Sequence, residues 1–362
     1  MTPPKAEEII AAEITRDGPI PFARYMEICL YHPEAGYYQR AAPATGRPGD
    51  FYTAPHVHAL FGHTIAQWIH SQAGRWGMGP VTLLELGPGN GRLARDILDW
   101  WGDRSPALAM VLVEGGGRRR AELEEAFLGQ PVSVMDEAGL DLLDPFEGFV
   151  LANEFFDALP LRVFQKADGA LAELFVDLQG RELVELLCES GLPGGAPDEV
   201  LSLLPEGFRT EISPQWQVWM ERISRVLARG QALILDYGEY TDGLIVPWRM
   251  GGTLRCYRGH QVDTDPLEAP GDKDITAHVN FSLLGSWAAQ AGLEVRSLVS
   301  QASFLVRSGI LDLMTREMEA LTERQATELW LKVKNLVHDE EGMGELFKAM
   351  VLEKGKRERE EG

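Results

Sequence analysis

Apolar runs alternate with amphipathic stretches from Val81 into the middle of the chain. The apolar runs read VTLLEL, AMVLVE, VSVM and GFVLANE, and the stretches between them include NGRLARDILDWW and RRRAELEEAF, with apolar residues at helical spacing. Strands that alternate regularly with helices predict a parallel sheet with right-handed crossovers. A helix over 213–230 that feeds the buried strand ALILDYG extends the same alternation.

Helical patterns flank this core on both sides. Residues 1–78 carry amphipathic patterns and are expected to form an N-terminal helical cap. The core is expected over 79–160 and 200–310, and it ends with a helix and two strands, FSLLGSWAAQAG, EVRSLVS and ASFLVR. Residues 311–362 are expected to form a C-terminal helical extension.

Two insertions interrupt the predicted core. Residues 161–199 hold three strand-like runs with turns between them, which predicts an antiparallel insertion. Residues 240–280 are irregular and rich in Gly, Asp and Pro. That length is unusual for a structureless connection in a compact domain, so we expect a lid or binding loop there.

Composition and charge narrow the possible partners. The chain has 362 residues, is 45% hydrophobic, and carries 55 Asp and Glu against 34 Lys and Arg, a net charge of −21. Such a charge repels a phosphate backbone and attracts a basic protein segment, so we expect a protein partner and no nucleic acid. Since no stretch approaches the roughly 18 apolar residues of a membrane span, no membrane insertion is expected.

The cysteines and the N-terminus bear on location. Cys29, Cys188 and Cys256 are far apart and form no CxxC, which argues against a zinc ribbon and a disulfide framework and favours a reducing compartment. The first residues, MTPPKAEEIIAAEI, lack the marks of a signal or transit peptide. We therefore expect a bacterial cytoplasmic protein.

The first predicted strand runs into a glycine-rich turn and then a helix, in LLELGPGNGRLARDIL. Glycines at such a turn let a ligand approach the main chain at a helix N-terminus. The spacing is Gly87, Gly89 and Gly91, and Arg92 stands where the dinucleotide fingerprint has its third glycine. This weakens a nicotinamide interpretation and favours S-adenosylmethionine (SAM).

Acidic residues end the successive strands of the predicted sheet. The carboxyl ends of parallel strands meet at one edge, so these side chains should lie around the cofactor. Glu114 is placed to accept the ribose hydroxyls and Asp136 to read the adenine, and the edge as a whole includes Glu85, Glu114, Asp136, Asn153 and Glu154. A solvated edge without a ligand is the alternative interpretation.

Several blocks, in order along nearly the whole chain, resemble the MidA family. They are GDFYTAP, LLELGPGNGRLARDIL, NEFFDALP, SPQWQVW, LILDYG, the run from TLRCYRGHQ to GDKDITAHV, and MGELFK. The family comprises SAM-dependent methyltransferases and includes a mitochondrial complex I assembly factor that is an arginine methyltransferase. The resemblance implies a Rossmann-like class I fold with a mostly parallel seven-stranded sheet. The chain departs from the family's usual motif at His56, where a Glu is usual.

The resemblance places the active site in NEFFDALP. Glu154 and Asp157 are the expected catalytic pair, with Asn153 positioning the acceptor. An arginine acceptor has a delocalised lone pair and a pKa above about 12. Carboxylates can orient the guanidinium in a bidentate pair and receive the proton released on methyl transfer.

Other blocks supply the expected surroundings of the site. Residues Asp50, Phe51 and Thr53 are expected to close over the cofactor, and residues Asp236, Tyr237, Arg258 and His260 to line the acceptor side. A loop hydrogen-bond network is the alternative for the last four. The histidines at 56, 58, 63 and 70 match no known ligand spacing, so no metal is predicted.

The leading prediction is therefore a methyltransferase acting on an arginine of a protein partner, which the family resemblance identifies with a respiratory complex I subunit. Three alternatives remain: a SAM-binding assembly factor with little turnover, a small-molecule methyltransferase, and a nicotinamide enzyme. Loss of methyl transfer in Glu154→Gln with retained cellular function would favour the assembly factor.

Overall fold

The structure is a computed structural model that describes residues 5–39, 54–189, 204–258, 261–263, 265–338 and 343–355. The chain forms two compact units, each assembled from three separate segments. Unit 1 comprises Met1–Phe51, Phe156–Trp219 and Gly238–Trp287, and unit 2 comprises Tyr52–Phe155, Met220–Tyr237 and Ala288–Gly362. The units differ from the expected division, because the predicted cap at 1–78 is shared between them.

A mostly parallel sheet forms the centre of unit 2. Its strand order is β15-β16-β10-β5-β2-β3-β4, and among the described residues an eighth strand, β14 (Val279–Asn280), pairs in parallel with the end of β10. Among these strands only β16 is antiparallel to its neighbours, β10 and β15. The strand bounds are β2 Val81–Leu86, β3 Leu108–Val113, β4 Val132–Met135, β5 Phe146–Asn153, β10 Leu227–Glu239, β15 Glu294–Ser300 and β16 Phe347–Lys354. The predicted mostly parallel sheet is confirmed, and the short strand β14 adds an eighth strand to the seven that were predicted.

The strand order reverses beside β2. The chain first moves outward from β2 to β3 and β4 through the crossover helices α5 (Arg92–Trp101) and α6 (Gly117–Ala126). After α7 (Glu137–Leu142) it returns to β5 on the other side of β2. In open α/β sheets, ligands bind outside the carboxyl ends of the strands at such a reversal. The glycine turn that follows β2 lies at this point.

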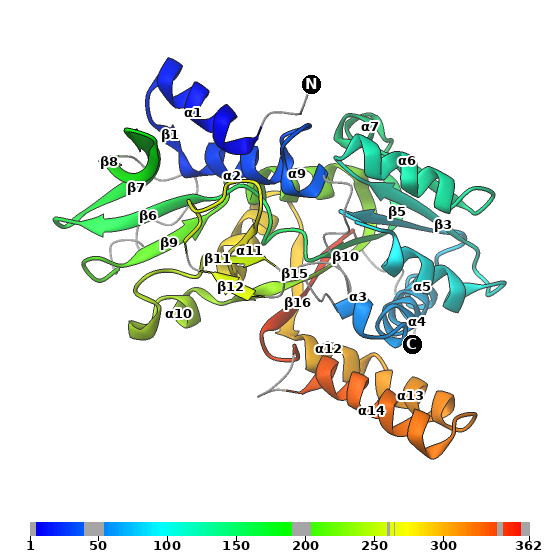
Figure 1. Cartoon of the computed structure of the whole chain (residues 1–362). Helices are drawn as coiled ribbons and strands as arrows, with labels where there is room; N and C mark the ends of the chain where they lie inside the picture. Colours follow the sequence, from blue (N-terminus) through cyan, green and yellow to red (C-terminus); the bar gives the residue numbers. More distant parts are fainter. Residues whose placement is uncertain are drawn as a thin grey trace. The chain divides into compact units, whose positions relative to one another are not determined.

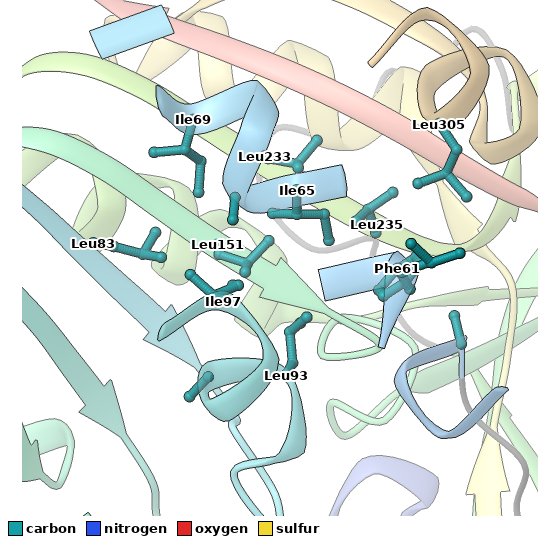
Figure 2. Packing of buried hydrophobic residues seen from close by; sticks show 14 of the residues in the cluster. Phe61, Ile65, Ile69, Leu83, Leu93, Ile97, Leu151, Leu233, Leu235 and Leu305 are labelled. Atoms are coloured by element: carbon teal, nitrogen blue, oxygen red, sulfur yellow. The ribbon is translucent and has the colours of Figure 1, made fainter. Parts of the chain in front are cut away.

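Helix α4 (Leu60–Arg75) packs against the sheet and contributes to the core of unit 2. Phe61, Ile65 and Ile69 repeat every four residues on one face of that helix, and all three are buried. In Figure 2 they point toward side chains of the sheet strands, among them Leu151 and Leu233. The apolar periodicity of the sequence thus fixes which face of α4 is buried.

Unit 2 ends in three helices and a strand. The helices are α12 (Gln301–Arg307), α13 (Ile310–Met318) and α14 (Glu323–Val337). ASFLVR was predicted as a strand, and this is wrong, because Ser300 caps a helix there by accepting a hydrogen bond from the Ser303 amide at 3.3 Å. The extension expected to be helical over 311–362 also differs, since Phe347–Lys354 is strand β16.

An antiparallel sheet forms the centre of unit 1. Its order is β1-β7-β6-β9, with β8 also paired to β7. The bounds are β1 Ile20–Pro21, β6 Arg162–Ala167, β7 Ala170–Gln179, β8 Glu182–Glu189 and β9 Arg209–Ile212. The antiparallel pairing predicted for the three runs after residue 160 is confirmed by β6, β7 and β8 (Figure 1).

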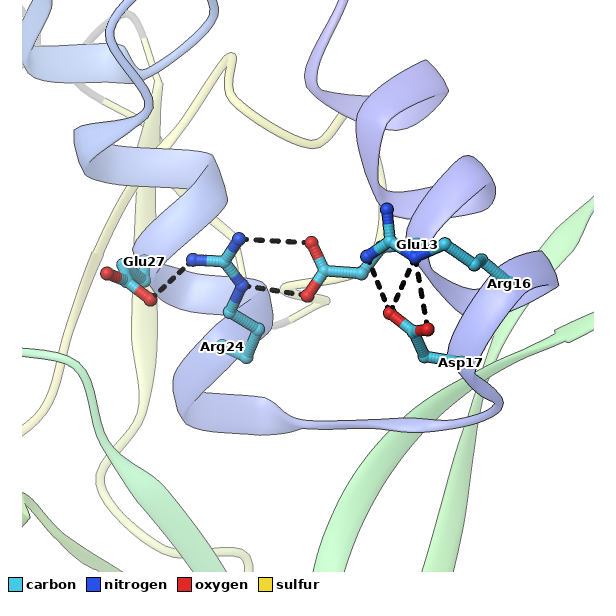
Figure 3. A network of polar contacts seen from close by, with 5 residues as sticks. All are labelled: Glu13, Arg16, Asp17, Arg24 and Glu27. Atoms are coloured by element: carbon cyan, nitrogen blue, oxygen red, sulfur yellow. Dashed lines mark hydrogen bonds and ion pairs between the residues drawn. The ribbon is translucent and has the colours of Figure 1, made fainter.

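Two N-terminal helices, α1 (Ala6–Asp17) and α2 (Phe22–Tyr31), belong to unit 1. Figure 3 shows Arg24 of α2 between two carboxylates. Its Nε and Nη2 donate hydrogen bonds to the carboxylate oxygens of Glu13 of α1 at 2.8 and 3.0 Å, and its Nη1 donates to Oε2 of Glu27 at 2.7 Å. Because the arginine side chain is 43% exposed, this network stabilises the pair of helices only modestly.

The remainder of unit 1 covers the region expected to be an irregular lid. It contains short elements: α10 Thr241–Leu244, a 3₁₀ turn at Pro247–Arg249, β11 Arg255–Arg258, β12 Gln261–Asp263, β13 Asp274–Thr276 and β14 Val279–Asn280.

Helix α9 (Pro214–Val226) stops four residues before the predicted glycine stop, because β10 begins at Leu227. Helix α11 covers Phe281–Gln290, α3 covers Ala54–Val57 and a 3₁₀ turn covers Tyr37–Gln39. Within the described residues no helix is both long and apolar enough to cross a membrane.

Candidate cofactor site and active site

The glycine turn after β2 adopts left-handed backbone at all three glycines. Gly87, Gly89 and Gly91 have φ of 63°, 56° and 72°. A Cβ on Gly87 would lie 2.8 Å from the Phe155 ring, and one on Gly91 would lie 2.7 Å from Phe127. A Cβ on Gly89 would meet no atom of the described residues within 4 Å. Gly87 and Gly91 are therefore required by packing, and Gly89 borders open space.

A buried carboxylate lies directly before this turn. Glu85, near the end of β2, is 2% exposed, and its Oε2 has no hydrogen-bond partner among the described residues. Burial raises the pKa of Glu85 to about 8. A buried acceptor without a donor is costly, and it suits a site where a ligand supplies the donor or a positive charge.

A second carboxylate contacts the turn from the next strand. Glu114 follows β3 and accepts a hydrogen bond from the Gly116 amide at 2.8 Å. Burial raises its pKa, while backbone hydrogen bonds from Gly116 and Gly89 act in the opposite direction. The backbone bond from Gly89 places Glu114 beside the glycine turn, and its predicted contact with the ribose hydroxyls stays a prediction.

Asp136 follows β4 and serves as the N-cap of α7. Its Oδ1 accepts a hydrogen bond from the Gly139 amide at 2.9 Å, and its Oδ2 lies 3.6 Å from Nη2 of Arg120. Arg120 also donates to the backbone oxygen of Glu114 at 3.1 Å. The capping bond gives Asp136 a local structural role, and its predicted contact with adenine stays a prediction.

Glu154 stands just beyond the end of β5 in a strained conformation. Its φ is 50°, a left-handed value that is uncommon for a residue with a side chain. Its amide donates to the Leu235 carbonyl at 2.8 Å, and its Oε1 accepts from the Ala54 amide and from Nδ2 of Asn153, both at 3.3 Å. The surrounding bonds thus hold one carboxylate in place against its backbone preference.

Asp236 of β10 fixes the same turn from the neighbouring strand. Its side chain is fully buried, and it accepts hydrogen bonds from the Phe155 amide at 3.1 Å and from the Tyr237 amide at 2.8 Å. Tyr237 packs its ring 3.9 Å from that of Phe347. These contacts favour a positioning role for Asp236, whereas the sequence predicted a substrate contact.

Asn153 offers an acceptor that the protein does not use. Its Oδ1 is buried and has no hydrogen-bond partner among the residues that the structure describes. Because the Nδ2 of the same amide is bonded to Glu154, the free oxygen points away from that bond. Asn153 therefore presents a hydrogen-bond acceptor beside the Glu154 carboxylate, and its predicted role in positioning the methyl acceptor stays a prediction.

The remaining predicted site residues are distributed differently. Asp157 belongs to unit 1, where it is 3% exposed and its carbonyl accepts from the Ala277 amide at 3.3 Å. Arg258 ends β11 in the same unit and is exposed. Four predicted residues lie outside the described residues: Asp50, Phe51, Thr53 and His260.

The structure adds two residues that the sequence argument did not place in the site. They are His56 of α3 and Asn90 of the glycine turn. The Nε2 atom of His56 lies 3.0 Å from Nδ2 of Asn90. Burial lowers the pKa of His56, which favours the neutral ring. The only signal in the sequence was the position of His56 in a block that resembles the family's motif.

The strand order and the open glycine turn define a Rossmann-like α/β protein of the class that binds a nucleotide-containing cofactor at the reversal of its sheet. Residues 62–299 match the profile of a family of S-adenosyl-L-methionine-dependent methyltransferases. The chain belongs to this family, as the motif blocks predict, and its cofactor is SAM.

Curated relatives and a solved structure agree with this assignment. The chain is 31% identical over 370 residues to the mouse protein arginine methyltransferase NDUFAF7, mitochondrial, covering 94% of this chain and 82% of that protein. The Drosophila melanogaster homologue is 31% identical over 379 residues, covering 95% and 83%. A Burkholderia thailandensis crystal structure with bound S-adenosyl-homocysteine superimposes with a TM-score of 0.85 at 31% identity, covering 96% of this chain and 92% of that one.

The expected bacterial cytoplasmic location is contradicted by these relatives, which are named mitochondrial proteins. The expectation rested on the composition of the first residues, which carries no information about where the family's members reside.

Proposed function

We propose that this methyltransferase transfers a methyl group to an arginine side chain of a protein partner. The observation that carries the proposal is Glu154, a carboxylate held at φ 50° by hydrogen bonds to both its main chain and its side chain. Strained backbone persists where the surrounding structure enforces it, and it concentrates at functional sites. The relatives named protein arginine methyltransferases support the choice of acceptor.

The residues around the glycine turn fit the cofactor. The buried Oε2 of Glu85 suits the ammonium end of SAM, and the open space at Gly89 allows the ligand to lie against the main chain. Glu114, bonded to the same turn, suits the ribose hydroxyls, and Asp136 the adenine. The bound cofactor supplies the methyl group on a sulfonium.

The acceptor chemistry falls to Glu154, Asn153 and Asp157. A carboxylate draws the guanidinium charge toward itself and fixes its plane, while the free Oδ1 of Asn153 can accept one of the N–H groups. The proton lost from the methylated nitrogen then passes to a carboxylate. Tyr237, Arg258 and His260 are proposed to line the acceptor side, and the segment with Asp50, Phe51 and Thr53 to cover the cofactor.

The partner is proposed to be a basic segment of a protein, in keeping with the net charge of −21. The resemblance to the MidA family suggests a respiratory complex I subunit as that protein.

The test is transfer of labelled methyl from SAM into proteins of an extract from cells that lack this gene, followed by hydrolysis to identify the modified amino acid. We expect methylarginine in one band with the wild-type protein and none with Glu154→Gln. Glu147→Gln is the matched control, because Glu147 lies on the same strand at its other end and pairs with Arg229.

Calorimetry with S-adenosylhomocysteine completes the design. The Glu154→Gln protein should still bind it, since Glu85 and the glycine turn are intact. Binding without any label from the wild-type protein would refute the proposed reaction and favour an assembly factor with little turnover. Label recovered in a small molecule would refute the protein acceptor.

A further inference from the structure

A cavity of about 330 Å³ lies within unit 1, formed entirely by residues of that unit. Its floor is apolar and buried, and it consists of Phe22, Val163, Leu174 and Pro266. The volume falls at the lower end of the range of small ligand sites. The floor therefore suits one apolar side chain or a ligand fragment of similar size.

Charged side chains form the walls and the mouth. Arg209 and Glu185 neutralise each other, with Nη1 of the arginine 3.0 Å from Oε1 of the glutamate. Arg249 and Arg255 also line the cavity, and neither forms an ion pair with a carboxylate among the described residues. Two uncompensated guanidinium groups are notable on a chain with a net charge of −21.

The fifth charged group of the lining, Glu211, already has hydrogen-bond partners. Glu211 is 5% exposed and accepts hydrogen bonds from the Thr253 amide at 3.0 Å, the Thr253 hydroxyl at 3.0 Å and the Leu254 amide at 3.3 Å. Its charge is spread over these donors, so it competes little for an incoming ligand.

The same bonds give the cavity a fixed wall. Gly252 has φ +80°, and a Cβ there would lie 2.0 Å from Oε1 of Glu211. The turn that carries Arg249 and Arg255 on either side can therefore fold onto Glu211 only with glycine at this position. A wall held in this way is preformed, which lowers the cost of binding a ligand.

The mouth presents an exposed aromatic ring. Trp248 is 81% exposed and lines the cavity next to Arg249. Tryptophan and arginine are the residue types most enriched at the energetic centres of protein interfaces. A ring that faces outward serves a polypeptide lying across the mouth better than a small molecule enclosed below it.

We propose that this cavity, named here the Trp248 pocket, binds a peptide segment in which an apolar side chain stands next to a carboxylate. The apolar side chain enters the floor, the carboxylate pairs with Arg249 and Arg255, and the backbone crosses Trp248. Resting on the proposed function, the segment belongs to the methyl-accepting protein, and the pocket is a docking site separate from the residues that contact the arginine.

Binding can be measured by calorimetry on the full chain without SAM. The probes are acetyl-Ala-Phe-Glu-Asp-Ala-amide, its neutral counterpart acetyl-Ala-Phe-Gln-Asn-Ala-amide, and phenylpropionate as a free small carboxylate. We expect the acidic peptide to bind about tenfold more tightly than either of the others, a typical gain for charge-assisted hydrogen bonds. Equal affinity for the two peptides, or tighter binding of phenylpropionate, overturns the proposal.

Variants locate the binding. Trp248→Ala and the pair Arg249→Gln with Arg255→Gln should each weaken binding of the acidic peptide about tenfold. The controls are Trp330→Ala and Arg324→Gln, which alter an exposed tryptophan and an exposed arginine of α14 in unit 2. Weakening by the controls to the same extent overturns the assignment, since it would indicate a nonspecific surface effect.

Methyl transfer separates this proposal from the proposed function. In Trp248→Ala the KM for the protein substrate should rise severalfold, with kcat and the Kd of S-adenosylhomocysteine unchanged. An unchanged KM with normal transfer refutes docking alone. No transfer by the wild-type protein refutes the proposed reaction alone, and the peptide titrations then decide on the pocket.

Discussion

At the scale of single residues, the site depends on a few side chains whose surroundings oppose their ordinary behaviour. Glu85 is a carboxylate buried beside a glycine turn, and Glu154 is held in left-handed backbone. Both arrangements are costly for the protein alone, and both residues are proposed to act on a bound ligand.

Replacing Gly89 by Val should abolish cofactor binding with little loss of fold. The added side chain would enter the open space at the turn, and the positive φ adds a strain of about 1–3 kcal/mol. Calorimetry with S-adenosylhomocysteine and thermal unfolding measure the two effects. Gly180→Val is the matched control, because Gly180 has φ +68° and equally open surroundings in the β7–β8 turn. Undiminished affinity in Gly89→Val would contradict the proposed role of the turn.

Glu85 should make stability depend on pH. Its pKa is raised from 4.5 to about 8, so the folded protein holds a proton there that the unfolded chain has lost. The stability from this group is complete below about pH 4.5 and is lost as the pH rises toward about 8. The free energy of unfolding of the wild-type protein should therefore fall, relative to Glu85→Gln, between these pH values.

The same group should release protons when the cofactor product binds. The ammonium group of S-adenosylhomocysteine beside Glu85 would favour the ionised carboxylate. Calorimetry at pH 7 in buffers of different ionisation enthalpy measures the release, which Glu85→Gln should abolish. Equal proton release by both proteins would assign it to another group.

At the scale of elements, the sequence predicts well where apolar periodicity is strong. The alternation from Val81 onward predicts β2, β3, β4 and β5, and the glycine turn together with the motif blocks predicts the SAM cofactor. It fails at β16, FKAMVLEK, because charged residues at the ends of the run conceal a buried strand. Lys348 and Glu353 are buried there, and Glu353 pairs with Arg296 and Gln231 from neighbouring strands. Such pairing is a long-range property that no local pattern contains.

The candidate site shows the same limit. The strand ends that carry Glu85, Glu114 and Asn153 could be predicted, whereas the roles of these three residues stay predictions. The contact of His56 with Asn90 and the burial of Asp236 beneath the Phe155 amide depend on segments that are distant in the chain. Asp136 also accepts a local capping bond from the Gly139 amide, which its place at a strand end alone does not reveal.

Helix α4 should provide much of the stability of unit 2. Ile65 is fully buried against the sheet, and Ile65→Ala should lower the free energy of unfolding by about 2–5 kcal/mol. Leu331→Ala on α14, where the side chain is 53% exposed, should change it by no more than about 0.5 kcal/mol. Urea denaturation of both variants measures the difference, and comparable losses would show that α4 is not the principal packing element.

At the scale of the whole molecule, the net charge of −21 should govern capture of the substrate. A basic segment is attracted over a distance that shrinks as salt shortens the Debye length from about 10 Å at 0.1 M. Raising the ionic strength severalfold should increase the KM for the protein substrate and leave the Kd of S-adenosylhomocysteine nearly constant. A KM that is independent of salt would exclude long-range attraction as the basis of recognition.

Strand β16 has a further consequence for how the molecule is made. It lies between β10 and β15, yet it follows both of them in the chain. While the ribosome is still translating the codons for 347–354, the nascent chain holds a sheet with a missing interior strand and two unsatisfied edges. The sheet of unit 2 is therefore completed only after residues 347–354 have left the ribosome, and until then β10 and β15 present unpaired edges of the kind that favour aggregation.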